Sequence, residues 1–164
     1  MVDKSSRNAS KLRKIDDTDH AILRILSKNA RVKLTSLARE IRLSIDSTKK
    51  RMQKLEENKV ILRYTINVDP EKLGRPLGIH VYVKFKDLVK EKYDEFIDEL
   101  MKDYRVVVLM DIIGDYDLLI VFLTKGTEEM AEIKTELRQK FGSIIGDWKE
   151  VVISKVHVLE DFRF

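Results

Sequence analysis

Apolar residues recur at helical spacing early in the chain and at strand spacing beyond it. The early part holds three short amphipathic stretches, within residues 22–26, 34–41 and 48–55. Spacings of three and four place such side chains on one face of a helix. Ser44 immediately precedes the third predicted helix, near residues 45–58, where its hydroxyl suits a helix N-cap. The pattern therefore predicts a three-helix domain over residues 15–60, in which a short helix and a tight turn lead into a third helix.

The later part of the chain alternates between strand and helix patterns. Residues 61–76 form a strand-like connector that ends in a turn containing Gly and Pro. Strands are predicted near residues 79–85, 104–113, 116–124 and 148–158, and helices near residues 93–101 and 127–141. Gly114 and Asp115 separate the middle two strands, as in a tight hairpin turn. This β-α-β-β-α-β order is that of a ferredoxin-like plait, here spanning residues 77–164.

The predicted fold class is α+β, with an N-terminal three-helix, winged helix-turn-helix domain followed by a ferredoxin-like βαββαβ plait. Two helices cover one face of the sheet in such a plait. The other face is predicted to carry His80, Tyr82 and Met110. Because one chain leaves these side chains uncovered, we expect a second copy to pack against them and form a homodimer.

Charge is distributed unevenly between the two parts. The 164 residues carry a formal net charge of +4. Residues 1–63 hold 17 Lys and Arg against 8 Asp and Glu, whereas the remainder holds 15 against 20. A basic module that binds a polyanion would explain this asymmetry. The alternative is chance variation in charge along a chain in which 37% of the residues are charged. Residues 1–14 contain few apolar side chains and are predicted to form a flexible basic arm.

The third predicted helix, near residues 45–58, has a polar face opposite its apolar stripe. Asp46, Lys50 and Gln53 lie on that face at 100° per residue. A helix in this position of a helix-turn-helix presents its side chains to the DNA major groove, where Lys and Arg contact phosphates or guanine and Gln pairs with adenine. The alternative is a solvated basic face on a helical bundle. The candidate DNA-binding residues are Arg31, Ser44, Asp46, Ser47, Lys49, Lys50, Arg51, Gln53 and Lys54.

Several functional classes lack their required residues. The absence of Cys excludes disulfides and thiolate sites, and His20, His80 and His157 follow no metal-binding or catalytic spacing. We therefore expect no enzyme activity, no metal site and no cofactor. Apolar runs such as residues 106–110 are too short to cross a bilayer, and the polar N-terminus does not resemble a secretory signal. The expected location is the cytoplasm, in association with DNA.

The order of these pieces resembles the Lrp/AsnC, or feast/famine, family of transcriptional regulators. The similar segments are residues 15–23, 29–31, 37–41 and 44–55, together with the Ile-Gly-Asp-Tyr-Asp motif at 113–117. The resemblance implies a dimer built through the plait sheets, further assembly into tetramers or octamers, and an amino-acid effector bound between dimers beside residues 114–117. The chain departs from the family pattern at Lys59, where Gly is common. It departs again at Trp148 and Glu150, where small hydroxyl residues are common.

The resemblance places an effector site at Gly114, Asp115, Tyr116, Asp117 and Glu150. Backbone N–H groups of the turn would receive a carboxylate, and Asp115 or Asp117 would hold an ammonium group. The extra charge of Glu150, if it faces the same pocket, favours lysine, ornithine or a β-amino acid over leucine. The alternative is an empty pocket in which these residues only shape a hairpin.

The sequence thus predicts a sequence-specific DNA-binding transcriptional regulator that responds to an amino-acid-like effector through oligomeric assembly. Its expected partners are double-stranded DNA, further copies of the chain and the small ligand, but no membrane. Two other functions stay open at this point. One is an effector-independent architectural protein that coats DNA, and the other is an amino-acid-binding module of metabolism, since plaits serve many functions.

Overall fold

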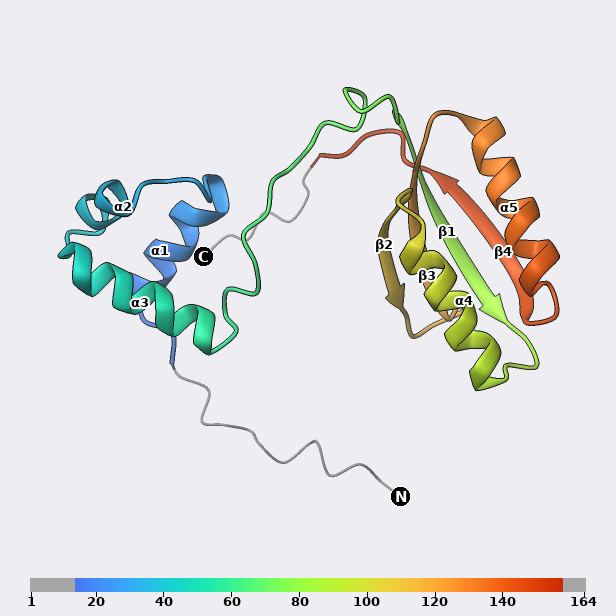
Figure 1. Ribbon diagram of the computed structural model, residues 1–164, viewed down its shortest axis with the longest axis horizontal. Coiled ribbons are helices and arrows are strands. Elements are labelled where there is room, and N and C mark those ends of the chain that lie inside the picture. The colour runs from blue at the N-terminus through green and yellow to red at the C-terminus, as the bar shows by residue number, and fades with distance from the viewer. Residues whose placement is uncertain (1–13, 158–164) are drawn as a thin grey trace, which may run out of the picture. The chain divides into compact units, whose positions relative to one another are not determined.

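The computed structural model describes residues 14–157, which fold as two compact units that divide between Asn67 and Val68 (Figure 1). This division falls inside the predicted connector, residues 61–76. The predicted basic arm lies outside the described residues except for Lys14, and so does the end of the last predicted strand, Val158.

The N-terminal unit contains the three predicted helices, α1 (Asp17–Lys28), α2 (Leu34–Glu40) and α3 (Ile45–Glu57). A capping box starts α1, because the Asp16 carboxylate accepts from the Asp19 N–H and the Asp19 carboxylate accepts from the Asp16 N–H. The core of the unit is small and consists of Ile22, Leu23, Leu26, Leu37 and Leu55. Each helix therefore contributes to one shared core.

Both α2 and α3 end at a residue in the left-handed region that is not glycine. Arg42 follows α2 with a φ of 56°, and Lys59 follows α3 with a φ of 54°. The Leu43 N–H donates to the Ala38 carbonyl, and the Val60 N–H donates to the Leu55 carbonyl. These bonds are those of a Schellman motif, in which glycine is usual. Lys59, at the position where the family commonly has glycine, thus adopts the conformation that glycine favours.

The connector differs from its prediction, because residues 61–68 form no strand in the described chain. The absence of a strand also removes the predicted wing from residues 14–67. Leu62 is 81% exposed and Ile66 is 73% exposed. A strand needs a neighbour with free backbone groups, and residues 14–157 pair none with this segment. Alternation of apolar residues alone therefore did not establish pairing.

The C-terminal unit is the predicted plait. Its elements are β1 (Leu77–Phe85), α4 (Lys90–Lys102), β2 (Val106–Asp111), β3 (Leu118–Thr124), α5 (Thr127–Phe141) and β4 (Ile145–Val152). The sheet is antiparallel with strand order β2-β3-β1-β4. The last strand begins three residues before its prediction and ends at Val152. The described helices include none long and apolar enough to cross a membrane.

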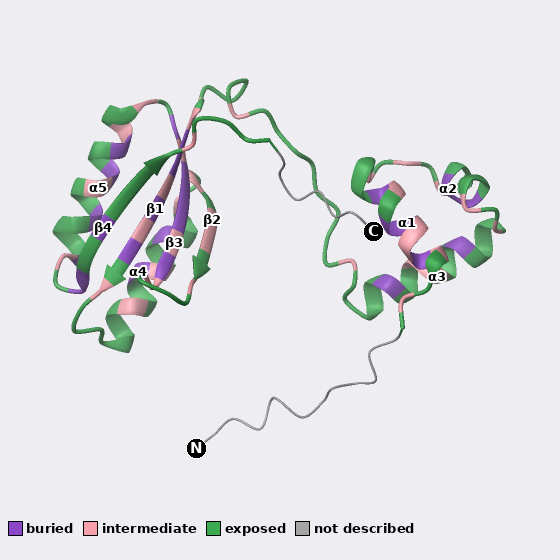
Figure 2. Ribbon diagram, turned by 180° about the vertical axis from the view of Figure 1, so that it is seen from behind, coloured by how far each residue is buried: buried purple, intermediate pink, exposed green. Residues whose placement is uncertain are grey.

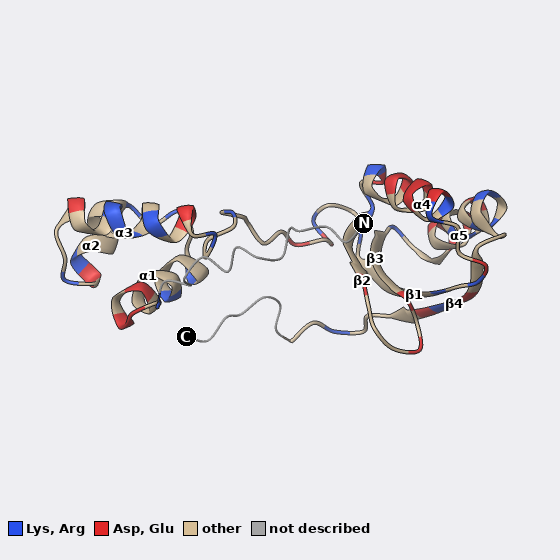
Figure 3. Ribbon diagram, turned by 90° about the horizontal axis from the view of Figure 1, so that it is seen from below, with Lys and Arg blue, Asp and Glu red and all other residues tan. Residues whose placement is uncertain are grey.

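The two faces of the sheet differ. Both helices lie on one side of it (Figure 3), where Val81 and Val83 of β1 pack with Phe96 and Phe141 from α4 and α5. Figure 2 shows that buried and intermediate residues predominate along β1 and β3, whereas most residues of β4 are exposed. The other side carries His80 and Tyr82, which alternate with the core residues along β1. In the register of the sheet they lie beside Val121 and Val151, and beside Leu119 and Lys149.

Candidate DNA-binding and effector sites

Local hydrogen bonds fix the start of α3. The Ser44 hydroxyl accepts from the Ser47 N–H at 3.1 Å and donates to the Ser47 hydroxyl at 2.8 Å. Thr48, one turn further, and Leu55, near the end of the helix, are buried. The cap and these two residues therefore set which face of α3 is turned outward. Ser44 and Ser47, both candidate DNA contacts, already share a hydrogen bond with each other.

The outward face of α3 presents free polar side chains. Asp46, Lys49, Lys50, Gln53 and Lys54 are all exposed. Within residues 14–157 none of their side chains forms an ion pair or a hydrogen bond, so each is available to a partner outside the chain. Figure 3 shows the basic residues spread along this helix. Arg31, in the link before α2, is also exposed, and only its backbone N–H is engaged, with Asn29 at 3.0 Å.

Arg51 behaves differently from its neighbours. Its guanidinium donates to both Asp16 carboxylate oxygens, at 2.9 and 2.7 Å, and to the Asp19 carboxylate at 2.9 Å. Hydrogen bonding from Arg51 lowers the pKa of Asp16, and the two carboxylates raise the pKa of Arg51. Arg51 therefore joins α3 to the start of α1. The sequence carried a signal for this contact, because acidic residues at a helix start attract a cation.

The turn between β2 and β3 is longer than the two-residue hairpin that was predicted. The strands stop at Asp111 and resume at Leu118, and the Ile112 N–H donates to the Asp117 carbonyl at 2.9 Å. Asp117 is held by β1, since its N–H donates to the Val83 carbonyl at 3.0 Å and its carboxylate accepts from the Phe85 N–H at 2.7 Å. Asp117 is therefore bonded both to Ile112 and to β1, and the loop between Ile112 and Asp117 consists of residues 113–116.

The predicted effector residues of this turn are partly engaged. The Tyr116 hydroxyl donates to the Asp147 carboxylate at 2.9 Å. Asp115 is exposed, and in the described part of the chain its carboxylate has no ion pair or hydrogen bond. A Cβ added at Gly114 would meet no atom within 4 Å, so the space beside it is open. Gly114 and Asp115 are therefore the members of the set that remain accessible to a ligand.

Glu150 does not join the turn. Its carboxylate accepts from the Trp148 indole N–H at 2.7 Å and pairs with the Lys134 ammonium at 2.9 Å. It lies on β4 opposite Val81, and β1 separates that strand from β3. The expectation that Glu150 faces the effector pocket is therefore corrected, because sequence alone did not give the strand register.

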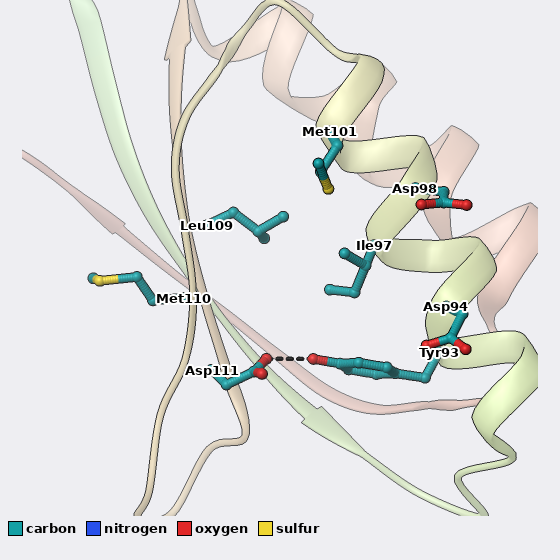
Figure 4. A pocket seen from close by; sticks show the side chains of 8 residues that line it. All are labelled: Tyr93, Asp94, Ile97, Asp98, Met101, Leu109, Met110 and Asp111. Carbon is teal, nitrogen blue, oxygen red and sulfur yellow. Dashed lines mark hydrogen bonds between the residues drawn. The ribbon is translucent and has the colours of Figure 1, made fainter. Parts of the chain in front are cut away.

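A hollow of about 700 Å³ adjoins the turn, between α4 and the edge strand β2 (Figure 4). Its lining residues are Tyr93, Asp94, Ile97, Asp98, Met101, Leu109, Met110 and Asp111. The Tyr93 hydroxyl donates to the Asp111 carboxylate, and burial together with this bond raises the pKa of Tyr93 to about 12. The lining combines three carboxylates with apolar side chains and contains no Lys or Arg. Sequence reasoning missed it, because it depends on how α4 lies against β2.

Comparison with known proteins agrees with this arrangement. Residues 15–56 match the AsnC-type helix-turn-helix domain. The chain is 30% identical over 145 residues to the HTH-type transcriptional regulator FL11 of Pyrococcus furiosus, which covers 87% of the chain and 91% of the relative. It is 35% identical over 132 residues to the HTH-type transcriptional regulator LrpA of Pyrococcus horikoshii, and the match covers 80% of this chain and 89% of the relative.

Solved structures show the same fold over nearly the whole chain. LrpC of B. subtilis superposes with a TM-score of 0.78 at 23% identity, covering 90% of this chain and 99% of that one. An AsnC family regulator from Agrobacterium tumefaciens superposes with a TM-score of 0.81 at 23% identity, and the match covers 90% of this chain and 96% of that one. With its three-helix unit, its plait and these relatives, the chain belongs to the Lrp/AsnC family of transcriptional regulators.

Proposed function

We propose that α3 enters the major groove of a specific DNA site and that Lys50 and Gln53 contact bases there. The observation that carries this proposal is the outward face of α3, whose polar side chains have no partner in the described chain. Gln53 can pair with adenine and Lys50 with guanine, while Lys54 on the flank suits a phosphate. Arg51 serves the same interface indirectly, by holding α3 against α1.

Footprinting with DNA fragments selected by the full chain tests this function. A regulator that contacts bases should protect limited sites made of two half-sites, spaced by about one or more helical turns. An architectural protein should instead protect all sequences evenly, with strong dependence on salt. Even protection would replace the proposed function with the architectural one.

We further propose that two copies of the chain meet through the uncovered face of the sheet. Tyr82 and Leu119 lie side by side on this face, in a unit whose other face is closed by helices. Sedimentation of the full chain tests the dimer. Tyr82→Glu places a carboxylate on this face and should give monomers. Lys102→Glu, at the end of α4 on the helix-covered side, serves as the matched control and should remain dimeric.

The effector proposal rests on the turn and the hollow beside it. Two solved regulators of this fold carry L-methionine, one from Neisseria meningitidis and one from M. tuberculosis. In this chain Asp115 and the acidic lining of the hollow favour a ligand with an additional ammonium group. We propose a basic amino acid such as lysine or ornithine, bound beside Gly114 and coupled to assembly.

Calorimetry of the full chain with lysine, ornithine, leucine and methionine tests the effector site, with sedimentation of each mixture. A ligand shifts assembly only by its different affinities for the two states, so the two measurements belong together. Asp115→Asn should abolish binding of the basic ligands, whereas Glu150→Gln should leave it unchanged. Binding that survives Asp115→Asn would remove the ligand from this turn.

A further inference from the structure

One apolar side chain lies among the polar groups at the start of α3. Ile45 is the first residue of the helix and remains 47% exposed. It is the large apolar side chain of α3 that stays on the surface, since Met52 packs against the core and Leu55 is buried within it. The core of the N-terminal unit therefore does not account for Ile45.

The position of Ile45 is well defined. Ser44 caps the helix directly before it, and the Thr48 hydroxyl donates to the Ser44 carbonyl at 2.9 Å. Ile45 also lies one turn before Lys49, on the flank of the exposed face. In a helix a β-branched side chain has one strongly preferred χ1 rotamer, so little side-chain freedom is lost when a partner contacts it.

The major groove offers one apolar group to such a side chain, the C5-methyl group of thymine. Residues at the N-terminal end of a recognition helix are those that contact base edges. We propose that Ile45 packs against a thymine C5-methyl group in each half-site and fixes the base preference at that position. The proposal rests on the entry of α3 into the major groove proposed above, and it adds a specificity-determining residue to that surface.

The test combines Ile45→Ala with deoxyuridine, which pairs like thymidine but lacks the C5-methyl group. The probe is a duplex selected by the wild-type full chain from random-sequence DNA, with each thymine of a half-site replaced in turn. At one position the replacement should weaken wild-type binding about fourfold per half-site, the effect of one buried methyl group. Ile45→Ala should weaken binding to the thymine duplex similarly and should no longer distinguish thymine from uracil there.

Matched variants distinguish this contact from a general loss of apolar surface or of folding. Ile45→Val keeps the branched side chain and should retain most of the discrimination. Val60→Ala removes apolar surface just beyond α3, where Val60 is 37% exposed, and should leave the thymine-to-uracil ratio unchanged. Alanine favours helix, so Ile45→Ala should fold normally, and a thermal unfolding curve verifies this.

Three results would overturn the proposal. The first is that Ile45→Ala binds DNA as tightly as wild type. The second is that Ile45→Ala binds more weakly but still distinguishes thymine from uracil as wild type does at every position, the result expected if Ile45 contacts another protein copy instead of DNA. The third is a selected half-site without thymine. Lys50→Ala and Gln53→Ala are measured in parallel. If these two lose affinity while Ile45→Ala does not, only the methyl contact fails; if none does, the placement of α3 fails as well.

Discussion

The face of α3 and the turn at residues 112–117 are both exposed and polar, yet they are built differently. On α3 the capping hydroxyls, Thr48, Arg51 and Glu56 are engaged within the fold. The side chains of Asp46, Lys49, Lys50, Gln53 and Lys54 are unengaged within the described residues. In the turn a free group directly precedes two engaged ones: in the described part of the chain the Asp115 side chain has no hydrogen bond, whereas Tyr116 and Asp117 are bonded. Exposure alone therefore does not distinguish the two regions, whereas the division between engaged and free polar groups does, and the proposed DNA and effector contacts use the free groups.

The largest effect is expected from Arg51→Ala, which acts on an engaged group of α3. Asp19 is fully buried, and the substitution removes the guanidinium that bonds to it at 2.9 Å. Removal of this guanidinium from a buried carboxylate should destabilise the N-terminal unit by roughly 3 kcal/mol. Hydrogen exchange at the amides of α1 and α3 measures the change. Lys54→Ala removes an equal charge from the free face and should leave hydrogen exchange unchanged. If Arg51→Ala and Lys54→Ala change exchange equally, the distinction between engaged and free side chains of α3 is wrong.

Lys50→Ala and Gln53→Ala act on the free groups of α3. If the side chains contact bases, each should weaken specific binding by about 1–3 kcal/mol and relax the preference at one position. Lys54→Ala should weaken all sequences alike and lower the salt slope by about 1. Titration of selected and scrambled duplexes at several salt concentrations measures both quantities. The matched control is Lys125→Ala in the plait, where a comparable loss would point to general charge instead.

Asp115 and Asp117 provide the same contrast within the turn. Asp117→Ala leaves the Phe85 N–H without its acceptor and should destabilise the plait by about 1–2 kcal/mol. Asp115→Ala should leave stability nearly unchanged, since the Asp115 carboxylate has no hydrogen bond within residues 14–157. Denaturant unfolding followed by Trp148 fluorescence compares the two variants. A larger loss for Asp115→Ala would contradict the assignment of free and engaged groups.

Acid should affect the N-terminal unit through Asp16. Arg51 hydrogen bonds hold the pKa of Asp16 below its ordinary value of 3.8. A lowered pKa in the folded state gives stability that is present above the unfolded pKa and is lost as the pH falls through the folded pKa. The free energy of unfolding should therefore decline below about pH 4. Arg51→Ala should flatten this decline, and an unchanged pH profile in that variant would exclude the pair as its source.

The smallest effect concerns Lys59, whose φ of 54° favours glycine. Relief of left-handed strain outweighs the additional entropy of an unfolded glycine only slightly, so Lys59→Gly should stabilise the N-terminal unit by about 0.5 kcal/mol. Lys59→Ala keeps the strain and should give no gain. Thermal unfolding of both variants provides the comparison, and equal stabilities would place the strain elsewhere.

Periodicity predicted the helices and the order of the strands, because the buried faces of α3 and β1 follow spacings that local sequence contains. It gave residues 61–68 as a strand-like segment, because alternation describes which side chains share a face and not whether a neighbouring strand exists. The same limit applies to the turn, where the bond from Phe85 to Asp117 crosses 32 residues of sequence.

The placement of the candidate site residues could be predicted from the sequence only where the contacts are local. Outward residues such as Lys50 and Gln53 follow from the helical phase of α3 alone. The role of Arg51 depends on α1, which lies 32 to 35 residues earlier in the chain. Glu150 was assigned to the turn by resemblance, and only the register of β4 against β1 shows that it faces Lys134 instead.

The central claim is that the free face of α3 contacts base edges in the major groove. Dimethyl sulfate methylates guanine at N7 in the major groove and adenine at N3 in the minor groove, so protection from it distinguishes the two grooves. With the wild-type chain on a selected duplex, we predict protection of guanine N7 in both half-sites and its loss at one position in Lys50→Ala. Protection confined to adenine N3, or identical patterns for wild type and Lys50→Ala, would contradict the claim.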